Sequence, residues 1–93
     1  MAILVHHRSA VWNQELYTAT FNGAIPDTSK PPAGLIAHFA GPMASGGWQV
    51  IDVWESEDAL RAFMETDVAR VVQGIQAPPF ESTVVDVANS LIP

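Results

Sequence analysis

The sequence predicts an α+β fold: one ferredoxin-like domain over residues 1–93, with strands and helices in the order βαββαβ. Three observations predict this fold. Four apolar, β-branched segments alternate with two amphipathic helical segments, a glycine-rich turn joins the second and third strands, and 93 residues suffice for only one hydrophobic core. We expect a four-stranded antiparallel sheet with both helices on one face, because right-handed crossovers put them on the same side.

The first half of the chain supplies one strand and one helix. Residues 2–8 are apolar and β-branched without a breaker, so we expect the first strand there. Residues 12–22 place Trp12 and Leu16 at helical spacing, and Gly23 follows where a glycine commonly ends a helix. Residues 25–34 contain three prolines and are expected to form a loop.

The second half supplies a hairpin, a helix and a last strand. Residues 35–40 and 48–55 are the expected hairpin strands, joined by the glycine-rich turn 41–47. Ser56 is a typical N-cap for a helix that continues to Ile75, although Thr66 and Asp67 look like a second cap that would divide it. Prolines at 78 and 79 end the helix, and residues 82–88 are the expected fourth strand.

Both faces of the predicted sheet are apolar. Leu4 and Val5 are neighbours in the first strand, and Val53 and Trp54 in the third, so neither strand shows the polar alternation of a sheet with one face in water. The two helices can cover only one face. We therefore expect a homodimer in which two sheets pack face to face as a dimeric α+β barrel, with a standard interface of about 800 Å² per subunit.

The composition argues against several classes of partner. Ten acidic residues oppose four basic ones, the net charge is −6 at pH 7, and the basic residues are scattered. Nucleic acids and anionic membranes are therefore not expected partners. The apolar opening of residues 1–5 is far shorter than a membrane span or a signal-peptide core, and the lack of cysteine fits a reducing compartment. A cytoplasmic protein is expected.

The run from Gly47 to Phe63, GWQVIDVWESEDALRAF, resembles the third strand and second helix of the antibiotic-biosynthesis-monooxygenase-like family of dimeric α+β barrels. The resemblance covers nearly the whole chain, including the segments GLIAH at 34–38 and GP at 41–42. It implies a small-molecule-binding dimer from a family that includes cofactor-independent oxygenases and heme-degrading enzymes. Heme degradation is not expected here, because the family's heme-ligating histidine would fall at Gln73, its tryptophan at Phe63 and its asparagine at His7.

His38, Asp52 and His7 are the candidate catalytic residues. A histidine titrates near neutral pH and can act as an acid or a base, and His38 lies in a segment that resembles the family. Asp52 lies among Trp, Val and Ile in its strand, where a carboxylate needs a partner. Structural roles stay open for each residue, including a pairing of Asp52 with Arg8. Whether His38 and Asp52 share a face depends on the hairpin register, which the sequence leaves undecided.

Trp54, Trp48 and Phe63 are the candidate ligand-binding residues, since aromatic walls suit a flat ligand; ordinary core packing is the alternative. No metal site and no cofactor are expected. His6 and His7 point to opposite faces of their strand, and the third strand is expected to separate His7 from His38.

The resemblance therefore implies a small-molecule-binding protein, with cofactor-independent monooxygenation of an aromatic or polyketide-like substrate as the leading activity. A non-catalytic carrier dimer, and a polyketide cyclase or isomerase on the same fold, stay open, so catalysis itself is undecided. The expected partners are a second copy of the chain and the small molecule.

Overall fold

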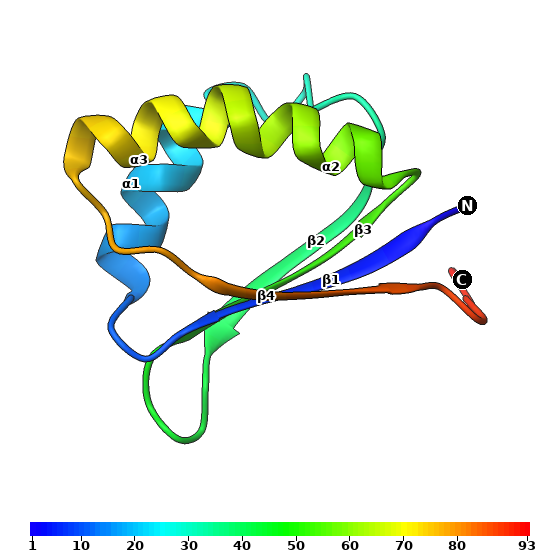
Figure 1. Ribbon diagram of the computed structural model, residues 1–93, viewed down its shortest axis with the longest axis horizontal. Helices are drawn as coiled ribbons and strands as arrows, with labels where there is room; N and C mark the ends of the chain where they lie inside the picture. Colours follow the sequence, from blue (N-terminus) through cyan, green and yellow to red (C-terminus); the bar gives the residue numbers. More distant parts are fainter.

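A computed structural model describes residues 1–93 and shows an antiparallel sheet with all helices on one side (Figure 1). The elements are β1 (Ile3–Ser9), α1 (Gln14–Ala24), β2 (Leu35–Pro42), β3 (Trp48–Trp54), α2 (Glu57–Phe63), the π-helical turn η1 (Met64–Val68), α3 (Ala69–Ile75) and β4 (Glu81–Asp86). The four strands lie in the order β2-β3-β1-β4, and every neighbouring pair is antiparallel. The predicted βαββαβ fold is confirmed.

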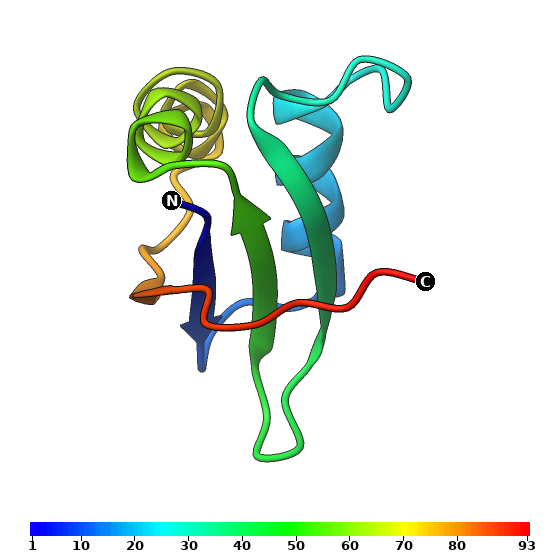
Figure 2. The same ribbon diagram turned by 90° about the vertical axis from the view of Figure 1, so that its right-hand side faces the viewer.

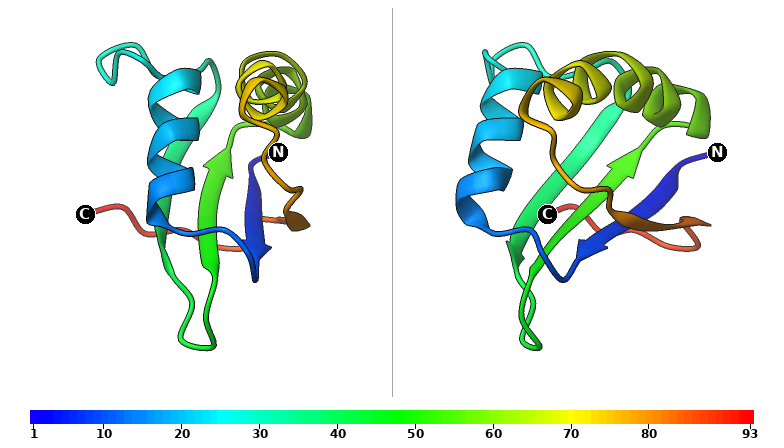
Figure 3. Two further views of the ribbon diagram at one scale, coloured as in Figure 1. Left: turned by 90° about the vertical axis from the view of Figure 1, so that its left-hand side faces the viewer. Right: turned by 60° about the vertical axis from the view of Figure 1, so that its left-hand side comes forward.

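The two helical segments cross each other above the sheet. Figure 2 shows α1 along its length beside the strands, whereas the continuous segment α2-η1-α3 is seen end-on. Figure 3 shows the same arrangement from the opposite side, with the segment lying across one end of the sheet. The core fills the space between the helices and the strands; its buried apolar residues are Ile3, Val5, Trp12, Ile25, Trp48, Val50, Trp54 and Leu60. No helix combines the length and apolarity that a membrane crossing requires.

The sheet has one covered face and one uncovered face. Alternate residues of β1 and β3 are buried against the helices, as the strand period of two dictates. The opposite face, here called the open face, carries the side chains of Leu4, Ala37, Phe39, Ile51, Val53 and Val85. All helices lie on the other side of the sheet, and Phe39 is 67% exposed. The expected second apolar face is therefore present.

Helix α1 is shifted by two residues from the expected range. Asn13 is its N-cap and its side chain accepts a hydrogen bond from the Leu16 amide, so Trp12 precedes the helix. The expectation that Gly23 follows the helix end was wrong, because Gly23 lies within α1. A Cβ atom at this glycine would lie 2.9 Å from Cγ2 of Val71, so Gly23 allows α1 to approach α3 closely.

The second helical segment begins as expected but does not break. Ser56 is its N-cap and accepts a hydrogen bond from the Ala59 amide at 3.1 Å. The suggested second cap at Thr66 was wrong, because its hydroxyl donates to the Ala62 carbonyl one turn earlier and the chain passes through η1 instead. The segment ends at Gln76, whose φ of 54° is left-handed. The fourth strand also begins one residue earlier than expected, at Glu81.

Candidate functional site

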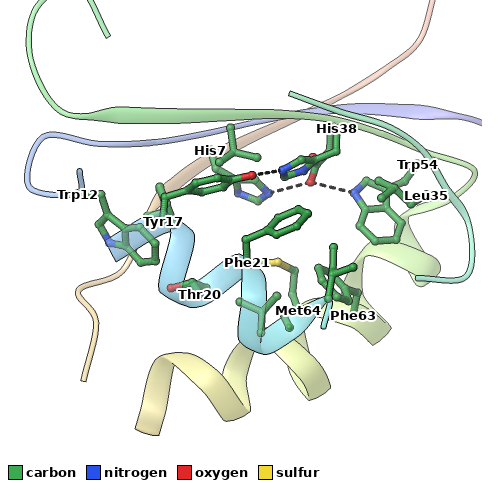
Figure 4. A pocket seen from close by; sticks show the side chains of 16 residues that line it. His7, Trp12, Tyr17, Thr20, Phe21, Leu35, His38, Trp54, Phe63 and Met64 are labelled. Carbon is green, nitrogen blue, oxygen red and sulfur yellow. Dashed lines mark hydrogen bonds and ion pairs between the residues drawn. The ribbon is translucent and has the colours of Figure 1, made fainter. Parts of the chain in front are cut away.

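A pocket lies between α1, the segment α2-η1-α3 and the covered face of the sheet (Figure 4). Its cavity volume is about 80 Å³. Six aromatic rings contribute to its lining: Trp12, Tyr17, Phe21, Trp54, Phe63 and Phe80. Among these rings lie three ionisable side chains on three adjacent strands, His7 of β1, Asp52 of β3 and His38 of β2.

A hydrogen-bonded chain of three side chains runs along the sheet side of the pocket. His38 lies directly opposite Asp52 in the β2–β3 ladder, and its Nδ1 is 2.6 Å from Asp52 Oδ1. The other ring nitrogen, Nε2, is 2.6 Å from the hydroxyl of Tyr17, which comes from α1 (Figure 4). The Tyr17 and His38 rings are nearly parallel, with an interplanar angle of 12°. These hydrogen bonds therefore link helix α1 to β3, one of the two central strands of the sheet.

The hydrogen-bond partners of Asp52 and His38 indicate where the protons lie in the Tyr17–His38–Asp52 arrangement. Asp52 is 5% exposed, and its Oδ2 also accepts a hydrogen bond of 3.2 Å from Nε1 of Trp54. A carboxylate only accepts, so Nδ1 of His38 carries a proton, and when the ring is neutral its Nε2 accepts from Tyr17. Burial, followed by the negative charge of Asp52, raises the pKa of Tyr17 above its ordinary value of 10.0. Tyr17 therefore stays protonated at neutral pH.

His7 approaches Asp52 from the opposite side. Its Nε2 is 3.8 Å from Asp52 Oδ2, and its Nδ1 is 2.6 Å from the hydroxyl of Ser82 in β4. Burial lowers the pKa of His7 below 6.5; Asp52 opposes this shift, while His38 and His6 add to it. One aspartate is therefore flanked by two histidines, of which His7 is neutral at pH 7.

The structure brings together the three candidate catalytic residues His38, Asp52 and His7. Trp54 and Phe63 also line the pocket, with ring centroids 5.5 Å apart. Trp48 is placed differently from the expectation: it lies outside the pocket lining and packs in the core against Trp12.

The alternative partner suggested for Asp52 was wrong. Arg8 lies on the open face, where its Nε is 3.5 Å from Glu81 and its guanidinium donates to Thr83. His6 also faces that side, and its Nε2 is 3.1 Å from the side-chain oxygen of Gln49.

Tyr17 and Ser82 are site residues that the sequence reasoning missed. Tyr17 and Phe21 are four residues apart and so share one side of α1, which is a signal for a helix face directed at a site. Ser82 had no local signal, because its contact with His7 joins residues 75 positions apart.

Two observations concern metal and heme binding. No group of three or more His, Asp or Glu side chains is arranged to hold a metal ion. Gln73, which occupies the position of the heme-ligating histidine in the resemblance, is exposed on α3 and lies outside the pocket lining.

Solved structures with this fold include known oxygenases. The structure of Rv0793 from Mycobacterium tuberculosis has a TM-score of 0.72 and 15% identity, covering 97% of this chain and 98% of that one. SnoaB, a cofactor-independent oxygenase from Streptomyces nogalater, has a TM-score of 0.66 and 15% identity, covering 97% and 95%. The monooxygenase from the gene ActVA-Orf6 of Streptomyces coelicolor, solved with nanaomycin D, has a TM-score of 0.66 and 16% identity, covering 99% and 91%.

No protein-family model matches the sequence, and no curated protein matches it. The structural similarity at these identities shows the fold. At the level of fold, the resemblance to antibiotic-biosynthesis-monooxygenase-like proteins is confirmed.

Proposed function

We propose that this chain is a small-molecule-binding protein of the antibiotic-biosynthesis-monooxygenase-like family that oxidises a hydroxylated aromatic substrate without a cofactor. The observation that carries the proposal is the hydrogen-bonded chain from Tyr17 through His38 to Asp52, which borders an apolar pocket. Oxygenation without a cofactor requires a base that removes a proton from an electron-rich ring, and a site that keeps water from the resulting anion.

The chain of three residues is arranged to move one proton. The Tyr17 oxygen accepts the hydroxyl proton of the substrate while its own proton passes to Nε2 of His38. Asp52 then stabilises the imidazolium, as the aspartate of a Ser-His-Asp triad does. Tyr17 does not attack the substrate. Because its pKa is raised, Tyr17 is not an anion before the reaction; it passes a proton on to His38 and does not act as the final base.

The oxidation itself balances with molecular oxygen as the only co-reactant. The phenolate transfers an electron to O₂, and the ring carbon para to the oxygen combines with the resulting superoxide. The peroxide takes the proton back from His38, and loss of water leaves a quinone. One substrate and one O₂ give one quinone and one H₂O, and the relay returns to its starting state.

The similar structures support this type of chemistry on this fold. SnoaB is described as a cofactor-independent oxygenase, and the ActVA-Orf6 enzyme was solved with nanaomycin D. A carrier would need the pocket but not two contacts of 2.6 Å that connect a phenol, an imidazole and a carboxylate. An isomerase or cyclase could use the same relay, and it would consume no oxygen.

We also propose that the protein is a homodimer joined through the open face. The helices cannot reach this face, and Phe39, Val85 and Leu4 are 67%, 51% and 37% exposed in the single chain. Apolar patches of this kind mark interaction sites, and a second copy of the sheet covers them at about 800 Å² per subunit. The proposed location is cytoplasmic.

Oxygen uptake tests the activity directly. The purified protein should consume O₂ in a 1:1 ratio with quinone formed from an electron-rich phenol in an oxygen-electrode assay. His38→Gln should lower the rate by about 10²- to 10⁴-fold, because general-base catalysis is lost. The control is Gln73→Ala, which changes an exposed residue of α3 outside the pocket lining and should leave the rate unchanged. Substrate conversion without O₂ uptake would identify an isomerase or cyclase, and binding without conversion would identify a carrier.

A further inference from the structure

One polar atom of the pocket has no role in this relay. Nε2 of His7 is buried and has no hydrogen-bond partner, and the residue as a whole is 6% exposed. Solvent does not reach this atom, so bulk water cannot satisfy it. A buried polar atom without a partner is unfavourable and needs an explanation.

The protonation of His7 can be assigned from its surroundings. The ring is neutral, so only one of its two nitrogens carries a proton. Nε2 faces the Asp52 carboxylate at 3.8 Å, whereas Nδ1 is 2.6 Å from a serine hydroxyl that can donate or accept. A lone pair on Nε2 would be repelled by the carboxylate. The proton therefore lies on Nε2, and Ser82 donates to Nδ1.

Asp52 has capacity left for one more donor on the same side. Its Oδ1 accepts from His38 and its Oδ2 from Trp54, while each carboxylate oxygen can accept about two hydrogen bonds. The distance of 3.8 Å between His7 Nε2 and Asp52 Oδ2 is too long for a direct hydrogen bond. An oxygen placed about 2.8 Å from each atom would contact both.

We propose that Nε2 of His7 and Oδ2 of Asp52 together bind a hydroxyl group of the ligand. The ligand oxygen accepts a hydrogen bond from His7 and donates one to Asp52. A carbonyl oxygen cannot do this, since it has no proton to donate and would face the carboxylate with a lone pair. The subsite thus selects a hydroxyl over a carbonyl or an ether.

The size of the cavity limits the rest of the ligand. An apolar cavity of about 150 Å³ holds one benzene molecule in a well-studied engineered protein. The cavity of about 80 Å³ here is about half that volume, so a fused set of rings does not fit, and one ring enters only when lining side chains move. The relay needs a first hydroxyl at Tyr17, and this part of the inference rests on the proposed function. Together with the His7 subsite it assigns a single-ring dihydroxybenzene as the substrate class.

Binding measured without oxygen tests the subsite separately from the activity. Resorcinol carries two hydroxyls, 3-methoxyphenol has one of them methylated, and 3-hydroxybenzaldehyde replaces one with a carbonyl group. Calorimetry on the full chain should show resorcinol binding about 10- to 100-fold more tightly than either analogue, since each leaves a buried polar group unpaired. Equal affinity for all three compounds, or no binding of resorcinol, would overturn the subsite.

Variants locate the effect at His7. His7→Leu should reduce resorcinol affinity to that of 3-methoxyphenol while leaving 3-methoxyphenol affinity unchanged, and His7→Gln should restore part of the difference because it keeps a donor. Gln73→Leu, at an exposed residue of α3 outside the pocket lining, is the control and should change neither affinity. Should His7→Leu fail to fold, the ligand selectivity of the natural chain still decides. Loss of selectivity with O₂ uptake intact refutes the subsite alone, whereas selectivity without O₂ uptake refutes the oxygenase alone.

Discussion

His38 and Asp52 face each other directly across the β2–β3 ladder, with 2.6 Å between Nδ1 and Oδ1. The pair exists because the β2–β3 register places both side chains on the covered face, where Tyr17 of α1 reaches the second ring nitrogen. A slip of the register by one residue would turn one of the two side chains to the open face. The hairpin register is therefore a condition for the site.

Asp52→Asn should lower the free energy of unfolding by about 1–3 kcal/mol, because the amide cannot accept from both His38 and Trp54 without directing an N–H at one of them. Urea denaturation measures this change. Asp86→Asn replaces an exposed aspartate in β4 and should stay within about 0.5 kcal/mol of the natural chain. Equal effects of the two substitutions would show that Asp52 is not held by these partners.

Phe39→Glu should convert a dimer into a monomer. Phe39 is 67% exposed on the open face, and a charge there would be buried without a partner between two sheets. Light scattering should give about 20 kDa for the natural protein, twice the chain mass of 10.0 kDa, and about 10 kDa for the variant. Val11→Glu is the control, since Val11 is equally exposed, at 68%, but precedes α1. A natural protein of 10 kDa at micromolar concentration would contradict the dimer.

Leu4 and Val5 should respond differently to a charge. Leu4 lies on the open face, whereas Val5 is fully buried beneath the helices. Val5→Asp should prevent folding, because an unpaired charge in the core costs several kcal/mol. Leu4→Asp should primarily affect association, and circular dichroism with light scattering separates the two results. Loss of secondary structure in both variants would mean that the single chain does not fold without its partner.

Gly23→Ala should destabilise the protein, whereas Gly74→Ala should stabilise it. A methyl group at Gly23 would meet Val71 at 2.9 Å, and overpacking of this kind typically costs about 1–3 kcal/mol. Nothing lies within 4 Å of a Cβ atom at Gly74 in α3, so alanine there should add about 0.5–1 kcal/mol. Thermal unfolding of both variants checks the signs, and Val71→Ala should relieve part of the Gly23→Ala defect.

Stability should fall in mild acid in a way that depends on His7. The folded state lowers the His7 pKa below 6.5, so just below that pH the unfolded chain binds more protons than the native one. Stability from this group is unaffected above pH 6.5 and decreases as the pH falls through the window between the two pKa values. Urea denaturation at several pH values should show a smaller acid loss for His7→Gln than for the natural chain. An identical pH dependence in the variant and the natural chain would contradict this assignment.

The sequence predicts most of the fold because the relevant signals are local. Apolar, β-branched runs, turn glycines and the Ser56 cap locate strands and helices to within about two residues. The end of α1 was predicted wrongly at Gly23. From sequence, a glycine that allows close contact between helices cannot be distinguished from a glycine that ends a helix, and Gly23 is needed for contact with Val71. The π-helical turn was also missed, since it is set by how Thr66 bonds the preceding turn.

The site is only partly predictable for a different reason. His38, Asp52 and His7 stand out because polar side chains are unusual in apolar strands. Their grouping depends on the register of two strand pairs, which the sequence does not determine. Tyr17 and Ser82 join the site through contacts across 21 and 75 positions. A local sequence pattern does not show which residues so far apart in the sequence will be in contact.

The edge strand β4 belongs to both surfaces of the sheet. Ser82 lies opposite His7 on the covered face, with its hydroxyl 2.6 Å from Nδ1 of His7, whereas Val85 lies opposite Leu4 on the open face. All six residues of β4 are exposed in the single chain. A second copy of the chain that packs on the open face of β4 would therefore also fix the position of the His7 ring on the covered face. By thermodynamic reciprocity, if dimer formation raises the affinity for a ligand bound to His7, that ligand raises the affinity between the two chains by the same factor.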